Sequence, residues 1–427
     1  MKKLKIYMGI CGKSHLVGHI LVYKDRGAEF IYDDGYLEWP ECRPISISLP
    51  LEEKSFNSDR TKKFFEGLLP EGFTRRCVAN WLHKDETDYI SILSNLGREC
   101  LGAIKAVSEE DENVESSYRK LSAEEVKRLA QEGATESAEL VTKAHLSLTG
   151  ASGKVGLYYD NEKDEWYLPY GDAPSTHIVK QSHVRLKNIV ANEQLCLLTA
   201  KKLGIEVPES FIVKTTGIDS EDVLFATKRY DRKISVNNKK INGLTIPYRL
   251  HQEDFAQALG IASSDKYETN NEEYLVKMFL ILRNYSASPI EDQLKLWDIC
   301  VFNYLIGNTD NHVKNLSLLY SEDLKLIRLA PAYDIVSTIV YETSTEKMAL
   351  RVGDVYKLSD IRKGDFEKEA KKVGLGKNIA MKRFDSMSGK FLKAINEANE
   401  QLMDKGFRTE QLKEKILSKG GIAYITK

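Results

Sequence analysis

The sequence has few of the features that mark secreted, membrane-bound or zinc-containing proteins. Its cysteines are Cys11, Cys42, Cys77, Cys100, Cys196 and Cys300, far apart and with no Cys-x-x-Cys pair. This spacing argues against a disulfide framework and a zinc site, and predicts reduced, mostly buried thiols. No apolar run approaches the roughly 18–20 residues of a membrane span, and the first residues, "MKKLKIYMGICG", lack the apolar core of a signal peptide. The sequence therefore predicts a cytoplasmic protein without membrane association.

An excess of charge of one sign is also missing. The 427 residues include 62 Lys and Arg against 63 Asp and Glu, for a formal net charge of −1. Such a chain has no whole-molecule field that would attract nucleic acid or an anionic membrane. Its apolar content of 42% is that of an ordinary globular protein, and its length allows two or three domains or one large two-lobed enzyme.

Hydrophobic periodicity divides the chain into four regions. Residues 1–108 alternate as strands, including "PISISLPL" at 44–51, then become helical from Phe64 and return to a strand, which predicts an α+β subdomain. Residues 109–140 form an acidic and helical linker, in which Ser122 and Glu125 have the spacing of a capping box. Residues 141–248 predict a β-rich lobe with one helix, and residues 249–427 a helical lobe. A cleft between unlike lobes is a usual ligand site.

A polar stretch, "IGNTDNHVKN" (306–315), follows a predicted buried helix, "LKLWDICVFNYL". Asp310 precedes Asn315 by five residues, the separation of Asp and Asn in the catalytic loop of protein kinases. There, the aspartate accepts or orients the attacking hydroxyl and the amide oxygen holds Mg²⁺. The spacing alone is equally consistent with a solvated loop that ends a helix. A calcium loop is a poor alternative, since His312 and Lys314 occupy positions that would need oxygen ligands.

A second aspartate, Asp334, follows two predicted short strands, "NLSLLY" and "KLIRLA". In kinases, an aspartate across a short hairpin from the catalytic loop takes the Mg²⁺ that bridges the phosphates. The alternative is that Asp334 caps the start of a following helix.

A lysine and a glutamate form the third signal. Lys180 ends the apolar strand "THIVK", and Glu193 lies in the middle of the inward stripe of the next predicted helix. Because an unpaired buried carboxylate is strongly unfavourable, Glu193 needs a cation partner, and Lys180 is the nearest candidate. A strand-lysine to helix-glutamate pair positions the nucleotide-binding lysine of kinases.

Two further segments of the β-rich lobe suit a nucleotide. "SLTGASGKVGL" (147–157) contains Gly150, Gly153 and Lys154 and can approach phosphates, although it is not a Walker A loop. Lys228, Arg229 and Tyr230 end the last strand before the helical lobe, where backbone groups can meet an adenine edge; a charged surface at a domain joint is the alternative. The order of all these signals along the chain predicts a phosphotransferase.

At these residues the sequence also resembles a family, the HipA toxin kinases of bacterial toxin–antitoxin pairs. The resemblance rests on "FFEGLLPEG", "SLTGASGKVGL", "HIVK", "NEQLC", "NYLIGNTDNHVKNLSLLY" and "LAPAYDIVST", and covers nearly the whole chain. It implies an α+β, two-lobed protein-kinase-like fold and a serine/threonine protein kinase that uses ATP and Mg²⁺. It also implies a protein substrate such as an aminoacyl-tRNA synthetase and a HipB-like antitoxin, through which alone the chain would reach DNA.

The resemblance also implies a role for individual residues. Asp310 would be the catalytic aspartate, Asn315 and Asp334 the Mg²⁺ ligands, and Lys180 a phosphate contact. The glycine loop would consist of Thr149, Gly150, Ala151, Ser152, Gly153 and Lys154. Lys228, Arg229 and Tyr230 would hold adenine, His312 and Tyr333 would line the pocket, and Ser147 would be the autophosphorylated loop serine. Gly153 and Lys228 depart from the acidic residues expected at their positions. Two other functions stay open: a nucleotide-binding corepressor without transfer activity, and a small-molecule phosphotransferase.

Overall fold

The computed structural model describes residues 3–108, 114–132, 153–181, 186–215, 222–234, 238–269 and 272–425. The chain forms two compact units. Unit 1 comprises residues 1–183, 213–263 and 318–326; unit 2 comprises residues 184–212, 264–317 and 327–427. Because the chain passes between the units several times, neither unit is one continuous stretch of sequence.

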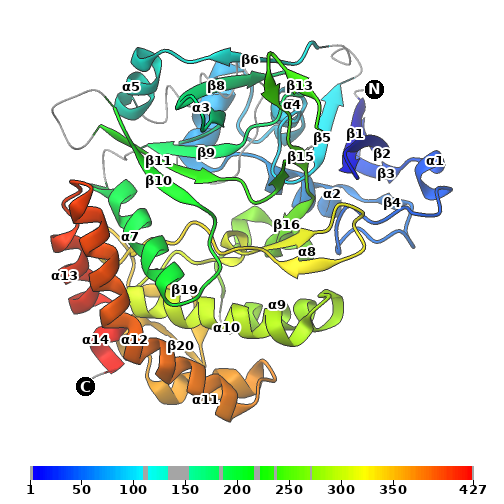
Figure 1. Ribbon diagram of the computed structural model, residues 1–427. Coiled ribbons are helices and arrows are strands. Elements are labelled where there is room, and N and C mark those ends of the chain that lie inside the picture. The colour runs from blue at the N-terminus through cyan, green and yellow to red at the C-terminus, as the bar shows by residue number, and fades with distance from the viewer. Residues whose placement is uncertain are drawn as a thin grey trace. The chain divides into compact units, whose positions relative to one another are not determined.

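The N-terminal part of unit 1 is a five-stranded antiparallel sheet with the order β4-β3-β2-β1-β5 (Figure 1). Its strands are β1 (Lys3–Ile10), β2 (Lys13–Tyr23), β3 (Gly27–Tyr32), β4 (Ser55–Phe56) and β5 (Ile104–Ser108). Its helices are α1 (Asp34–Leu37), α2 (Ser58–Phe65), η1 (Glu66–Leu68), α3 (Gly72–Trp81) and α4 (Tyr89–Leu96). Burial alternates along β1, as expected where one face of an antiparallel sheet packs on a core. The alternation seen in the sequence thus identified the first strands correctly.

The strand predicted for residues 44–51 is wrong. Side chains from distant parts of the sequence, and not a neighbouring strand, form hydrogen bonds with the backbone of this segment. The buried Tyr32 hydroxyl donates to Leu49 O at 2.6 Å, and the Glu253 carboxylate accepts from Ile47 N at 3.1 Å. Because buried backbone groups need partners but accept them from any source, the alternating pattern alone did not require a strand here.

Glu253 makes the stability of unit 1 depend on pH. Burial raises the pKa of this carboxyl to about 7, although the Ser46 and Tyr320 hydroxyls and the Ile47 amide donate to it. The folded protein therefore keeps a proton that the unfolded chain releases above about pH 4.5. Linkage then lowers the stability of the folded state as pH rises from about 4.5 to 7.

Glu253→Gln should remove this contribution, because the amide does not titrate. We expect the loss of unfolding free energy between pH 5 and pH 7.5 to be about 2–3 kcal/mol smaller in the variant than in the wild type. Urea unfolding at both pH values measures it. Identical losses in the two proteins would show that Glu253 has an ordinary pKa.

The second sheet of unit 1 has the strand order β10-β11-β9-β7-β8-β6. Its strands are β6 (Ser117–Lys120), β7 (Lys154–Asp160), β8 (Glu165–Tyr170), β9 (His177–Gln181), β10 (Ser210–Lys214) and β11 (Val223–Lys228). Helix α5 (Ala123–Glu132) starts with the predicted capping box: Glu125 N donates to Ser122 Oγ at 3.2 Å, and Ser122 N to Glu125 Oε2 at 2.9 Å. Part of the predicted linker is therefore built into the sheet, since β6 pairs with β8.

Short elements complete unit 1. They are β12 (Arg232–Lys233), β13 (Lys240–Ile241), β14 (Leu244–Thr245), β15 (Tyr248–Arg249), β16 (Gln252–Asp254) and α8 (Phe255–Leu259). η3 (Ser263–Asp265) and β17 (Ser317–Tyr320) lie where the chain passes between the units.

A buried ionic cluster joins the two sheets of unit 1. It consists of Glu99, Arg229, Asp231, Arg232 and Arg249, and we call it the Glu99 cluster. Glu99 lies in the loop before β5, whereas its cationic partners come from residues that follow β11. This cluster gives a physical reason why the predicted N-terminal subdomain and the β-rich lobe form one compact unit.

Unit 2 is mainly helical. Its helices are α7 (Ile189–Lys202), α9 (Tyr274–Tyr285), α10 (Pro289–Ile306), α11 (Lys363–Lys372), α12 (Lys377–Asp404), α13 (Glu410–Lys419) and α14 (Ile422–Ile425). Its remaining elements are η4 (Val313–Asn315), β18 (Ile327–Leu329), β19 (Lys347–Val352), β20 (Val355–Lys357) and η5 (Leu358–Asp360). The long helix α12 runs beside α7, and both can be followed in Figure 1. Trp297 and Phe302 on α10 pack with Phe366, Phe384 and Phe391 in the core.

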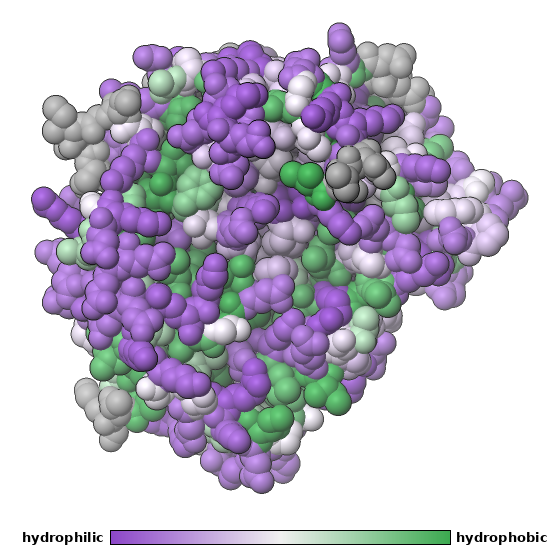
Figure 2. Space-filling view, viewed as in Figure 1, coloured by the Kyte–Doolittle hydropathy of each residue, from purple (hydrophilic) through white to green (hydrophobic). Residues whose placement is uncertain are grey.

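Figure 2 shows mostly hydrophilic residues over α12 and α13. None of the helices in the described part of the chain is both long and apolar enough to cross a membrane. All six cysteines are free, but only Cys100 and Cys196 are buried, so the prediction of mostly buried thiols is wrong.

Candidate functional site

The polar stretch 306–315 leaves the buried helix α10 through a glycine. Gly307 has φ +69°, and a side chain there would come within 2.4 Å of Ile339 Cγ2, so the turn requires glycine. The next residue is tied back to the helix, because Asn308 Nδ2 donates to Asn303 Oδ1 at 2.8 Å. In turn, Asp310 N donates to Asn308 Oδ1 at 3.2 Å. The position of Asp310 is therefore set by the end of a rigid helix.

Asp310 and Asn315 are brought together as their spacing suggested. The backbone oxygen of Asp310 accepts from Asn315 Nδ2 at 2.9 Å and from His312 N at 2.8 Å. Asp310 itself is exposed, whereas Asn311 and His312 are buried. The five-residue interval thus closes a compact turn that presents one carboxylate to solvent.

Asp334 belongs to the same framework. The segment after it bonds the end of α10: Ser337 Oγ donates to Ile306 O at 2.6 Å, and Ile339 N donates to Gly307 O at 3.1 Å. Asp334 has φ +56°, an uncommon conformation for a residue other than glycine and one that often marks functional sites. No helix begins in residues 331–346, so the alternative in which Asp334 caps a helix is wrong.

Tyr333, predicted to line the pocket with His312, contacts the polar stretch 306–315, to which His312 belongs. Tyr333 Oη lies 2.6 Å from Ser317 Oγ and donates to Lys314 O at 3.0 Å. The His312 ring packs edge-on against Tyr267, with centroids 5.2 Å apart. Contacts of Tyr333 and His312 with a nucleotide stay predictions.

Sequence reasoning missed Tyr267. Its hydroxyl donates to Asp310 Oδ1 at 2.6 Å, although 43 residues separate the two. No motif or periodicity in the sequence connects them. Sequence reasoning also missed Asn192 on α7, whose Nδ2 donates to Ser337 O at 2.9 Å and whose Oδ1 accepts from Ser337 N at 3.1 Å.

Asn315 and Asp334 offer the oxygen atoms that Mg²⁺ prefers. Because Asn315 Nδ2 donates to Asp310 O, the amide oxygen lies on the other side of the group. Within the described residues, no group of three or more His, Cys, Asp or Glu side chains is placed to hold a metal ion. Mg²⁺ usually takes only one or two ligands from protein side chains and the others from phosphates and water. Binding of Mg²⁺ by Asn315 and Asp334 stays a prediction.

The predicted nucleotide-contact residues of the β-rich lobe lie in unit 1. Lys180 on β9 is paired in register with Lys154 on β7 and with Phe225 on β11. Its Nζ is 5.4 Å from the centroid of the Phe225 ring. Lys154 and Lys180 are thus neighbours on adjacent strands. Of the predicted glycine loop, Gly153 and Lys154 are described, whereas Ser147, Thr149, Gly150, Ala151 and Ser152 lie outside the described residues.

The three residues predicted to hold adenine, 228–230, differ in their exposure and in their bonding partners. Lys228 is exposed at the end of β11, and the Tyr230 hydroxyl donates to Gln252 Oε1. Arg229 makes structural contacts instead. Its side chain is buried in the Glu99 cluster, and its backbone N–H donates to Thr176 O at 2.9 Å. Neither the guanidinium nor the N–H of Arg229 is therefore available to an adenine ring.

Glu193 is 4% exposed, as its position in the predicted inward stripe of α7 requires. Lys180 belongs to unit 1 and Glu193 to unit 2. Their ion pair stays a prediction.

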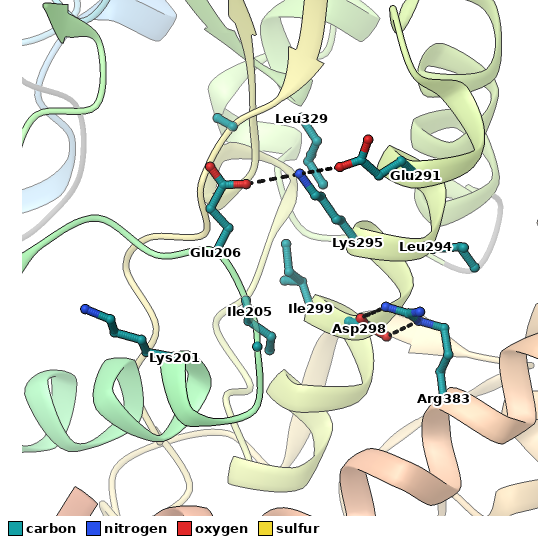
Figure 3. A pocket seen from close by; sticks show the side chains of 12 residues that line it. Lys201, Ile205, Glu206, Glu291, Leu294, Lys295, Asp298, Ile299, Leu329 and Arg383 are labelled. Carbon is teal, nitrogen blue, oxygen red and sulfur yellow. Dashed lines mark hydrogen bonds and ion pairs between the residues drawn. The ribbon is translucent and has the colours of Figure 1, made fainter.

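A cavity of about 460 Å³ lies in unit 2, and none of the predicted site residues lines it. Residues of α10, of β18 and of the loop after α7 line it, together with Arg383 on α12 (Figure 3). Lys295 pairs with Glu206 and Glu291, each at 3.1 Å, and Arg383 pairs with Asp298. With Lys201, three cations and three carboxylates line the cavity, so its lining has no net charge that would favour a charged ligand.

Comparisons with known proteins match two regions of the chain. Residues 8–107 match the HipA N-terminal domain and residues 146–395 the HipA-like C-terminal domain. A Sinorhizobium fredii protein named "Putative kinase Y4mE" is 29% identical over 398 residues, 91% of each chain. The serine/threonine-protein kinase toxin HipA of Shewanella oneidensis is 25% identical over 365 residues, which cover 83% of this chain and 80% of the toxin.

The fold agrees with these matches. HipA of Shewanella oneidensis, solved with HipB and its operator DNA, superposes with a TM-score of 0.80 at 24% identity. The superposition covers 99% of this chain and 97% of that chain. The predicted α+β, HipA-like fold is therefore confirmed. The match to the HipA-like C-terminal domain covers more than half of the chain, so the chain belongs to the HipA family.

Proposed function

We propose that the chain is an ATP- and Mg²⁺-dependent serine/threonine protein kinase, the toxin of a toxin–antitoxin pair, that acts in the cytoplasm. The observation that carries this proposal is the turn closed by Asp310 and Asn315 at the end of α10. It holds one exposed carboxylate beside an amide, on the same framework as Asp334. Family membership and the kinase names of the relatives support the same activity.

Each side chain has a distinct role in this proposal. Mg²⁺, held by Asn315 and Asp334, would neutralise charge on the ATP phosphates. Lys180, with Lys154 beside it, would bind those phosphates, and the backbone next to Lys228 and Tyr230 would contact adenine. Asp310 would take the proton of the acceptor hydroxyl. At the same time, the oxygen of that hydroxyl would form a bond to the γ-phosphorus. The bond from that phosphorus to the bridging oxygen then breaks, and ADP leaves with the electron pair.

The partners follow from the relatives. The Shewanella oneidensis protein was solved with HipB and operator DNA, so we propose a HipB-like antitoxin for this chain and DNA contact only through it. The formal net charge of −1 supports this, because most affinity for DNA comes from cations that neutralise phosphates. A translation component such as an aminoacyl-tRNA synthetase is the proposed protein substrate.

Autophosphorylation provides the experiment that tests this function. The purified chain is first treated with a phosphatase, which is then removed, and is incubated with ATP with or without Mg²⁺. We expect intact mass spectrometry to show one added phosphate only when both are present, and fragmentation to place it on Ser147. The matched variant Ser147→Ala should gain none.

Other outcomes distinguish the remaining functions. The wild-type chain could bind ATP and yet add no phosphate to itself or to added synthetases. This result would contradict the kinase proposal and favour a nucleotide-binding corepressor. Phosphate gain on small hydroxylated metabolites but not on protein would favour a small-molecule phosphotransferase.

A further inference from the structure

A tyrosine outside the predicted site contacts the proposed catalytic base. The Tyr267 hydroxyl donates to Asp310 Oδ1 at 2.6 Å, within the short range of O–H···O⁻ bonds to a carboxylate. Tyr267 is 45% exposed, and its ring packs edge-on against His312. Asp310 is also exposed. An acceptor side chain therefore has access to a carboxylate that already accepts one hydrogen bond.

One residue of β19 holds both members of this contact. Ala349 N donates to Thr309 O at 3.0 Å, and Ala349 O accepts from Glu268 N, also at 3.0 Å. Thr309 directly precedes Asp310, and Glu268 directly follows Tyr267. The Tyr267–Asp310 contact is thus part of a backbone arrangement and does not depend on the two side chains alone.

Glu268 fixes the chain beside Tyr267 further. Its carboxylate, 1% exposed, accepts from Tyr274 N at 2.9 Å and from Arg351 N at 2.7 Å. These bonds attach the segment to the start of α9 and to β19. Because buried carboxylates that accept several backbone N–H groups rarely move, the position of Tyr267 is well defined.

We propose that Tyr267 is a positioning residue for Asp310: its hydroxyl donates to Oδ1 and holds the carboxylate in the orientation that receives the hydroxyl of the acceptor serine or threonine. The inference rests on the proposed function and adds a residue to it. A carboxylate has two oxygens and about four acceptor directions, and the Tyr267 hydroxyl uses one of these directions. Fixing the base in one rotamer raises the fraction of encounters in which the acceptor proton has a base within reach.

The test compares Tyr267→Phe with the wild type. The variant removes only the hydroxyl and keeps the ring beside His312. We expect the maximal rate of phosphate gain at saturating Mg²⁺ and ATP, followed by intact mass, to fall about 10-fold, as expected for one hydrogen bond to a charged group. The ATP concentration for half-maximal rate should change less than about twofold, because Tyr267 holds the base and not the nucleotide. Tyr285→Phe, an exposed tyrosine on α9, is the matched control and should equal the wild type.

Either of two kinetic results overturns the inference. An unchanged rate in Tyr267→Phe would mean that Asp310 needs no orientation. A faster rate would mean that the phenol competes with the acceptor for the carboxylate.

A measurement that needs no catalysis separates this inference from the proposed function. The ¹³C resonance of the Tyr267 ring carbon that bears the hydroxyl, assigned by its absence in Tyr267→Phe, should shift in Asp310→Ala, while that of Tyr285 should not. No shift would show that the contact is absent in solution and would overturn the inference whatever the activity. A wild type that transfers no phosphate overturns the proposed function, whereas normal transfer by Tyr267→Phe overturns the inference alone.

Discussion

Replacing Asp310 with asparagine is expected to lower the rate of phosphate transfer by roughly 10²–10⁴, the usual contribution of a positioned general base. The substitution keeps the size of the side chain and an oxygen that accepts the Tyr267 hydroxyl, but removes the group that takes the acceptor proton. Because Asp310 bonds Asn308 and Asn315 through its backbone N–H and its backbone oxygen, the turn with Asn315 should persist.

The measurement is the initial rate of phosphate gain at saturating ATP, beside ATP affinity from calorimetry. Asp404→Asn, an exposed aspartate at the end of α12, is the matched control and should transfer at the wild-type rate. Wild-type transfer by Asp310→Asn would remove Asp310 from the chemistry and with it the main support for a kinase. Loss of ATP binding together with transfer would instead indicate that the turn itself had collapsed.

Replacing Glu99, in the Glu99 cluster, is expected to have the second large effect, a loss of stability. Glu99 Oε1 accepts from Arg229 Nη1 at 2.9 Å and from Arg232 Nη2 at 2.8 Å, and Oε2 pairs with Arg249 Nη2 at 2.6 Å. Burial raises the pKa of Glu99, but the three guanidinium groups outweigh it and hold the pKa at about 2. The carboxylate is therefore charged at neutral pH, and its removal would leave the buried Arg229 and Arg232 sharing Asp231 as their carboxylate partner.

Glu99→Ala should accordingly reduce the unfolding free energy of unit 1 by about 3–5 kcal/mol, the range for breaking a buried ion pair. Urea unfolding followed by tryptophan fluorescence measures the loss. Glu124→Ala, at an exposed position on α5, is the control and should change stability by less than about 0.5 kcal/mol. If Glu99→Ala does not fold, Glu99→Gln keeps the volume and allows the same comparison.

The same variant connects the fold with the site. Arg229 lies between Lys228 and Tyr230, so releasing its guanidinium should disturb the backbone proposed to contact adenine. We expect weaker ATP binding by Glu99→Gln at temperatures where the variant is still folded. Wild-type stability of both Glu99 variants would contradict this account of the cluster.

Local patterns in the sequence predicted the elements that local forces determine. Alternation along residues 3–10 reflects a strand with one buried face, and the Ser122–Glu125 spacing satisfies its own backbone donors without distant help. The turn from Asp310 to Asn315 closes within six residues. Such features depend on residues that are close in sequence, so the sequence alone is enough to predict them.

The functions of single polar groups depended on distant partners. Arg229 ends a strand beside Lys228 and Tyr230, and nothing near it indicates that Glu99, 130 residues earlier, neutralises it in the core. Residues 44–51 alternate like a strand, but Glu253, more than 200 residues later, bonds their backbone. Tyr267 precedes Asp310 by 43 residues and belongs to no motif.

By itself, then, the sequence determined the α+β composition, most of the strands and helices, the family and the set of candidate catalytic residues. Only the tertiary structure decided which polar groups serve the fold, as Arg229 does, and which carboxylate stays exposed, as Asp310 does. The physical reason is that a buried polar or charged group must find a partner, and the chain can supply that partner from any distance.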